Sequence, residues 1–164
     1  MHQLQDDQVD KIIAQWIALG YAEQELLAMA TIGRIKRVEV HLLKKLEQNY
    51  KKFDLLFWEF DVLATLKRSN AAITPTLLFK DMMVTSGTMT NRLQQLEKRN
   101  LIERVIDPND KRSLMVKLSP KGEKIINECV PAHIELENQL LSRLAPNEVE
   151  TLNQLLKKLE HTLA

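Results

Sequence analysis

The sequence predicts a mainly α-helical fold that carries one small β-hairpin. Three observations support this prediction. Only 4 glycines and 5 prolines interrupt the 164 residues. Apolar residues recur every three or four positions through most of the chain, which is the period of an amphipathic helix. Residues 101–118 are the exception, because two short runs of strand-forming residues flank a segment of turn formers there. The length suits one compact domain with helical extensions.

Three helices are predicted in the first part of the chain. They occupy residues 6–18, 23–49 and 55–69. Val9, Ile12 and Trp16 give the first helix an apolar face, and the other two carry similar stripes. Each helix must therefore pack one face against another part of the protein.

Two further helices are predicted by their capping residues. Thr74 supplies an N-cap and Pro75 suits the first helical position, so a short helix follows to about residue 83. After a tight turn, Thr85 or Ser86 can cap a second helix that runs through Asn100. This order predicts a helix-turn-helix.

The second of these helices has two different faces. Met89, Leu93 and Leu96 fall at helical spacing and should face the core. The opposite face carries hydroxyl, amide and guanidinium groups instead of a Glu/Lys mixture, namely Ser86, Thr88, Thr90, Asn91, Arg92, Gln94 and Gln95. Such groups can contact phosphates and base edges in a DNA major groove.

A hairpin and two more helices complete the prediction. Strands are expected at residues 101–106 and 113–118, around the turn-rich residues 107–112. Pro120 then begins a helix to about Leu144, in which Pro131 should produce a kink. Pro146 begins the last helix, whose long leucine stripe needs a cover that a partner subunit would provide.

Two short helices followed by a hairpin predict a winged helix-turn-helix. The predicted DNA contacts are Ser86, Thr88, Thr90, Asn91, Arg92 and Gln95 on the helix, and Lys111 and Arg112 at the hairpin tip. Asp110 could brace Arg112 by a charge-assisted hydrogen bond. The ordinary alternative is a hydrated polar helix face beside a plain turn. The agreement of order, spacing and polarity over residues 74–118 favours DNA binding.

These motifs resemble the MarR family of bacterial regulators. The resemblance rests on residues 85–93 (TSGTMTNRL), Leu96-Glu97, residues 101–104 (LIER) and residues 110–113 (DKRS), and it extends from about residue 35 to the end. It implies a homodimeric repressor that binds a palindromic operator in double-stranded DNA. The implied division is N-terminal helices for dimerisation and ligand binding (1–54), a winged helix-turn-helix lobe (55–118) and C-terminal dimerisation helices (119–164).

A narrower resemblance points to the urate-responsive branch of that family. It rests on the N-terminal helix with Trp16, residues 60–68 (FDVLATLKR) and Pro131-Ala132-His133, whereas residues 17–21 and 70–72 depart from the branch. The implied roles are a stacking platform for Trp16, a polar contact for Asp61, an anion clamp for Arg68 and a relay to the DNA-binding lobe for Arg104. The ligand would be urate, a related purine or a phenolic acid. Alternatively, Trp16 only packs its helix and Asp61–Arg68 is an ordinary ion pair.

Other classes of function have less support. The sequence has no phosphate-binding loop or nucleophile elbow, so we expect no enzyme, no catalytic residues and no cofactor. Cys129, His133 and Glu137 recur at helical spacing, which could place metal-binding groups on one helix face. The commoner outcome is a small buried thiol with a capped or solvent-facing histidine. The lone cysteine and the absence of a long apolar run favour a cytoplasmic protein without membrane contact. A helical adaptor that binds another protein remains the alternative.

Overall fold

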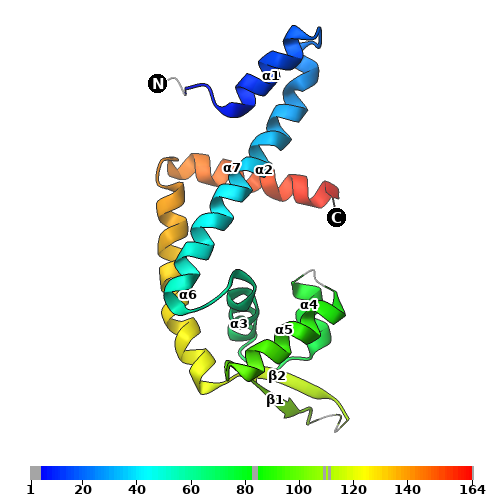
Figure 1. The fold of residues 1–164 in the computed structure, drawn as a ribbon, viewed down its shortest axis with the longest axis vertical. Helices are drawn as coiled ribbons and strands as arrows, with labels where there is room; N and C mark the ends of the chain where they lie inside the picture. Colours follow the sequence, from blue (N-terminus) through cyan, green and yellow to red (C-terminus); the bar gives the residue numbers. More distant parts are fainter. Residues whose placement is uncertain (1–4, 83–84, 109, 111, 164) are drawn as a thin grey trace. The chain divides into compact units, whose positions relative to one another are not determined.

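The computed structural model describes residues 5–82, 85–108, 110 and 112–163. The elements, shown in Figure 1, are α1 (Gln8–Ala18), α2 (Glu23–Tyr50), the 3-10 turn η1 (Lys51–Phe53), α3 (Phe57–Ser69), α4 (Pro75–Asp81), α5 (Ser86–Lys98), β1 (Ile102–Ile106), β2 (Leu114–Leu118), α6 (Pro120–Leu141) and α7 (Pro146–Leu163). The predicted mainly helical fold with one hairpin is confirmed. The chain forms two compact units, Met1–Lys45 and Leu46–Ala164.

The N-terminal unit contains α1 and most of α2. Asp7 caps α1 by accepting hydrogen bonds from the backbone of Val9 and Asp10, and the Asp10 side chain returns a bond to the Asp7 backbone. Val9 is buried and lies beside Gly33 of α2. Arg34 of α2 contacts Asp7 at 2.9 Å and also pairs with Asp10. That guanidinium lowers the pKa of Asp7 to about 2.

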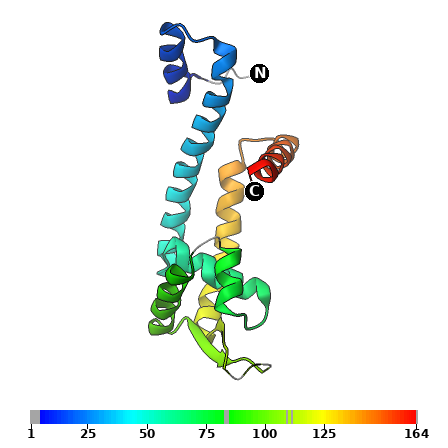
Figure 2. The ribbon, with the colours of Figure 1, turned by 90° about the vertical axis from the view of Figure 1, so that its right-hand side faces the viewer.

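The core of the second unit is built around α3. Val62 and Leu63 are fully buried, and α3 packs against both α6 and β2. Leu78 of α4, Leu93 of α5 and other apolar side chains close the same cluster. Figure 2 shows α4 and α5 beside each other above the hairpin. The helix-turn-helix is thus held by its apolar faces on a helical support.

The hairpin is an antiparallel pair whose register runs from Ile102 opposite Leu118 to Ile106 opposite Leu114. Ile73, just before α4, adds a single bridge to Val116 of β2, with two backbone hydrogen bonds of 3.0 and 2.8 Å. This bridge ties the beginning of the helix-turn-helix to the hairpin.

The links that flank the hairpin differ slightly from the prediction. α5 ends at Lys98 instead of Asn100, because Asn100 adopts a left-handed conformation with φ of 56°. Leu101 precedes the strand: its N–H donates to the Leu96 carbonyl and its own carbonyl accepts from Ser119. The Ser119 hydroxyl donates to the Asn100 carbonyl at 2.6 Å and accepts from the Gly122 N–H.

α6 leads from the hairpin to α7, which lies at the far end of α6 in both views (Figures 1 and 2). α6 continues through Pro131 and ends at Leu141, before the predicted Leu144. No described residue of α7 is buried, and its leucines Leu152, Leu155, Leu156 and Leu163 are exposed. None of the helices in the described ranges combines the length and apolar character that crossing a bilayer requires.

Candidate nucleic-acid interface and neighbouring polar face

Both helices of the helix-turn-helix begin at capping side chains. The Thr74 hydroxyl accepts from the Leu77 N–H, and Pro75 takes the first helical position as predicted. For α5 the cap is Thr85, not Ser86, because its hydroxyl accepts from the Thr88 N–H at 3.3 Å. These caps fix where the exposed edge of α5 starts.

The two faces of α5 separate as the sequence predicts. Met89, Leu93 and Leu96 are at most 1% exposed. The side chains on the other face that are exposed to solvent, which we call the groove edge, are Ser86, Thr88, Thr90, Asn91, Gln94 and Gln95. The groove edge therefore offers hydroxyl and amide groups without any contribution to the core.

Arg92 differs from its predicted companions on α5. Its side chain is only partly exposed, and its guanidinium carbon lies 5.4 Å from the centroid of the Trp58 ring on α3. At this distance the cation is attracted to the face of the indole. Arg92 thus lies against α3 and not on the groove edge.

The hairpin tip presents Arg112 to solvent. Its backbone N–H donates to the Asp110 carboxylate at 3.0 Å. This contact shapes the turn. The expected bond from Asp110 to the Arg112 guanidinium is not formed, because the carboxylate bonds the nearer backbone N–H instead. Lys111, also predicted to contact DNA, lies outside the described residues.

The end of α5 is held by an ion pair that the sequence analysis missed. Arg99 donates to both carboxylate oxygens of Glu59 on α3, at 2.7 and 2.6 Å, and also to Asp54. The Glu59 side chain is 2% exposed and accepts a further bond from the Leu56 N–H. Glu59 is recognisable as an N-terminal helix residue, but nothing in the sequence identifies Arg99 as its partner.

One face of α3 carries a polar stripe of Trp58, Asp61, Thr65 and Arg68, spaced by three, four and three residues. Arg68 donates to the Thr65 hydroxyl at 2.9 Å. The predicted ligand residues Asp61 and Arg68 therefore share this face. In the part of the chain that the structure describes, no hydrogen bond or ion pair engages the Asp61 carboxylate, so the ordinary Asp61–Arg68 ion pair is not formed.

The Asp61 carboxylate is partly buried, and this burial raises its pKa. The guanidinium groups of Arg92 and Arg68 act in the opposite direction without cancelling the effect of burial. Asp61 is thus a desolvated carboxylate with cations around it and none in direct contact.

The other two predicted ligand residues have different neighbours. Arg104 on β1 pairs with Glu97 at 3.0 Å, which connects the hairpin to α5, called here the groove helix. Trp16 belongs to the N-terminal unit, where its ring meets Tyr21 edge-on with 5.3 Å between centroids. Of the four predicted ligand residues, Asp61 and Arg68 share one helix face, and Trp16 belongs to the N-terminal unit.

The sequence also offered no sign of an aromatic cluster formed by Tyr50, Phe60 and His133. Tyr50 stacks on Phe60 with 4.3 Å between centroids and shares a 3.0 Å hydrogen bond with Nδ1 of His133. The other ring nitrogen of His133 lies 3.3 Å from Glu137. Burial raises the pKa of Tyr50. His133 is thus a packed residue of α6 and not a solvent-facing one.

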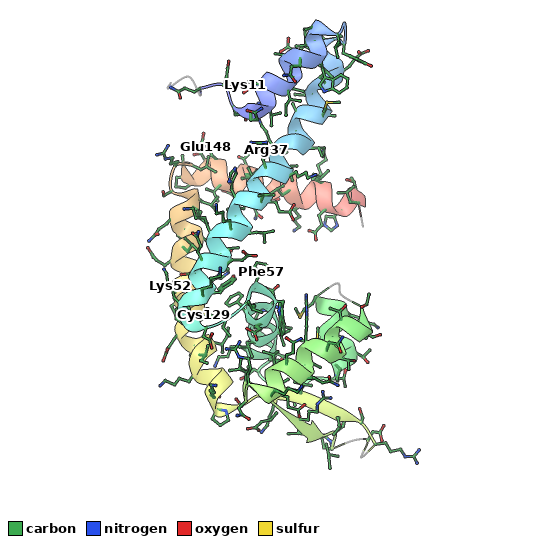
Figure 3. All side chains as sticks on the ribbon, viewed as in Figure 1. Lys11, Arg37, Lys52, Phe57, Cys129 and Glu148 are labelled. Carbon is green, nitrogen blue, oxygen red and sulfur yellow. The ribbon has the colours of Figure 1, made fainter. Side chains whose placement is uncertain are left out.

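Cys129 lies on α6, as Figure 3 shows, and is fully buried. Burial raises the pKa of its thiol to about 11, so the thiolate is scarce near neutral pH. Among the described residues, no group of three or more His, Cys, Asp or Glu side chains is arranged to hold a metal ion.

The chain is similar to known proteins in both sequence and structure. The model of the MarR family matches residues 58–114. The transcriptional regulator PecS of Dickeya dadantii is 33% identical over 137 residues, which cover 82% of each chain. A mutant MarR from Escherichia coli, solved with operator DNA, aligns over 82% of this chain and 96% of its own, with a TM-score of 0.73 and 33% identity.

A second solved complex supports the fold alone. MepR of Staphylococcus aureus bound to DNA aligns with a TM-score of 0.73 over 85% of this chain and 99% of its own, at 23% identity.

Proposed function

Since the chain belongs to the MarR family of transcriptional regulators, we propose that it binds a palindromic operator as a homodimer and represses transcription until a small aromatic anion releases it. The observation that carries the proposal is the groove edge, a row of short polar side chains on a helix whose other face is buried. PecS is named as a transcriptional regulator, and a mutant MarR has been solved with operator DNA. The protein is accordingly a regulator and not an enzyme.

The proposed DNA contacts are divided between helix and hairpin. Ser86, Thr88, Thr90, Asn91 and Gln95 would enter the major groove, where short side chains allow a close approach of the backbone. Exposed Arg112 would reach the minor groove or the phosphates, where negative potential attracts a guanidinium.

The proposed dimer is supported by the apolar side chains that a single chain leaves exposed. Leu155 is 61% exposed and Leu163 is 79% exposed, on a helix with no buried residue in its described part. A second copy could cover them through a two-fold interface, and the two groove helices would then face successive turns of the duplex.

The proposed ligand site is the polar stripe of α3. Asp61 could accept hydrogen bonds from N–H groups of a planar purine, and Arg68 could donate to its anionic oxygen atoms. Urate has this chemistry, and a related purine or a phenolic acid shares part of it. We further propose that Trp16 covers the bound ring and that Arg104 transmits binding to α5 through Glu97.

DNA binding is tested by selecting bound fragments from random duplexes and measuring their affinity by fluorescence anisotropy. Arg112→Ala should weaken binding about tenfold and reduce the salt dependence by about one counterion. Lys157→Ala on α7 removes the same charge far along the chain and should leave affinity within about twofold. If no duplex is enriched, or if affinity does not fall with salt, the protein is an adaptor instead.

Ligand release is tested by titrating the complex with urate, and with salicylate as a second planar anion. We expect the free protein to bind these anions and the DNA complex to release its DNA when they are added. Arg104→Gln should still bind urate but release DNA poorly. Unchanged DNA retention at millimolar urate would contradict the urate assignment.

A further inference from the structure

Arg92 of α5 is set apart from the groove edge by its contact with α3. It is part-buried, although its neighbours Asn91 and Gln95 on the same helix are exposed. Its guanidinium lies over Trp58, the first residue of the polar stripe of α3. The side chain therefore crosses from the groove helix to the proposed ligand site.

The polar stripe has a defined order of chemical groups. Trp58 comes first with Arg92 over its ring, Asp61 follows one turn later, and Arg68 ends the stripe with its hydrogen bond to Thr65. Of the positive charges around Asp61, that of Arg92 opposes the burial-induced rise in the pKa of Asp61 most strongly, ahead of Arg68. Asp61 thus shares one helix face with Arg68 and with Trp58, whose ring lies under the Arg92 guanidinium.

Charge balance decides how many cations the site needs. Asp61 already brings one negative charge into a partly desolvated place, and an anionic ligand brings a second. With Arg68 alone, the loaded site would hold an excess negative charge. A second guanidinium restores neutrality, and its planar fork can bond the oxygen or nitrogen edge of a flat ring.

We propose that Arg92 is a binding residue of the aromatic-anion site, supplying the second guanidinium beside Asp61 and so joining the ligand directly to the groove helix. This inference rests on the proposed function. A bound anion would hold α5 against α3 through the Arg92 side chain, in addition to any effect that passes through Arg104. The ligand and the operator then compete for the position of one helix.

The test is isothermal calorimetry of the free full-length protein with urate and with salicylate, in the absence of DNA. Arg92→Gln removes the charge but keeps a side chain of similar reach, and it should weaken binding about tenfold or more. Lys98→Gln is the matched control, because Lys98 is an exposed cation on the same helix, and it should change affinity less than about twofold.

Each result has a defined meaning. If the unaltered protein binds either anion and Arg92→Gln binds it equally well, the role of Arg92 is refuted while the proposed ligand class stands. If the unaltered protein binds neither anion, both fail. Should Arg92→Gln unfold in a circular dichroism melt, Arg92→Lys replaces it: a loss of about threefold or more supports the inference, because lysine lacks the paired donors, and unchanged affinity refutes it.

Discussion

Gly122 shows how closely the hairpin approaches α6. A Cβ atom at this position would lie 1.9 Å from the carbonyl oxygen of Leu101, and backbone atoms cannot move aside as a flexible side chain can. The same stretch carries the Ser119 hydroxyl, which bonds Asn100 and Gly122 together. The orientation of the hairpin relative to α6 therefore depends on a residue without a side chain.

We expect Gly122→Ala to lower the free energy of unfolding by roughly 1–3 kcal/mol or more, because the added methyl forces the two backbones apart. Urea denaturation measures this. Gly87→Ala is the control, since nothing lies within 4 Å of its added Cβ, and it should be neutral or slightly stabilising in a helix. Equal stability of the two variants would contradict the close contact.

Asp61 gives a prediction with a defined pH dependence. Its folded-state pKa is raised above the ordinary 3.8, so the folded protein is penalised for keeping it charged at neutral pH. Asp61→Asn should therefore raise the melting temperature at pH 7 while weakening urate binding. This gain in stability shrinks as the pH falls through the raised pKa of Asp61. It is gone below about pH 3.8, where the Asp61 carboxyl is protonated in both the folded and the unfolded chain.

Thermal melts between about pH 7 and pH 3.5 measure this gain. Gln94→Ala, at an exposed side chain that cannot ionise, should show no such pH-dependent gain. If Asp61→Asn is less stable than the parent at pH 7, the attraction of the Asp61 carboxylate to the neighbouring cations outweighs the cost of burying it.

At the scale of elements, apolar spacing and caps predict the helices well, and the exceptions have local causes. The pattern continues past Lys98 and Leu141, where the helices in fact end, because left-handed Asn100 and a tight turn after α6 stop them. The kink expected at Pro131 stays a prediction.

The sequence could not predict which side chains on different helices contact one another. The seven-residue spacing of Asp61 and Arg68 places them on one face of a helix, and the structure agrees. The pairing of Arg92 with Trp58, or of Tyr50 with His133 83 residues away, depends on how helices pack. Local periodicity carries no information about such partners.

The Glu59–Arg99 pair joins the beginning of α3 to the end of the groove helix, and it should be a main support of α5. Glu59→Gln removes the charge from a fully buried acceptor and should cost about 2–4 kcal/mol of unfolding free energy. Asp54→Asn alters the second ion pair of Arg99. Because the Asp54 side chain is 96% exposed, it should cost about 1 kcal/mol or less of unfolding free energy. Comparable losses in urea denaturation would show that burial of Glu59 is unimportant.

At the scale of the whole molecule, the proposed dimer predicts the effect of a charge on α7. Leu155→Glu should shift the protein from dimer to monomer in sedimentation velocity and abolish operator binding, because a charge would have to be buried at the interface. Gln154→Glu introduces the same charge at an exposed polar neighbour and should remain dimeric. A dimer that survives Leu155→Glu would place the interface elsewhere.

If the leucine stripe of α7 joins two copies and the dimer represses transcription, as proposed, protein abundance becomes a control in its own right. When most copies are monomeric, dimer concentration rises as the square of the number of chains, so doubling synthesis would give about four times as many operator-competent molecules. A cell could then relieve repression by diluting the protein through growth, without any effector.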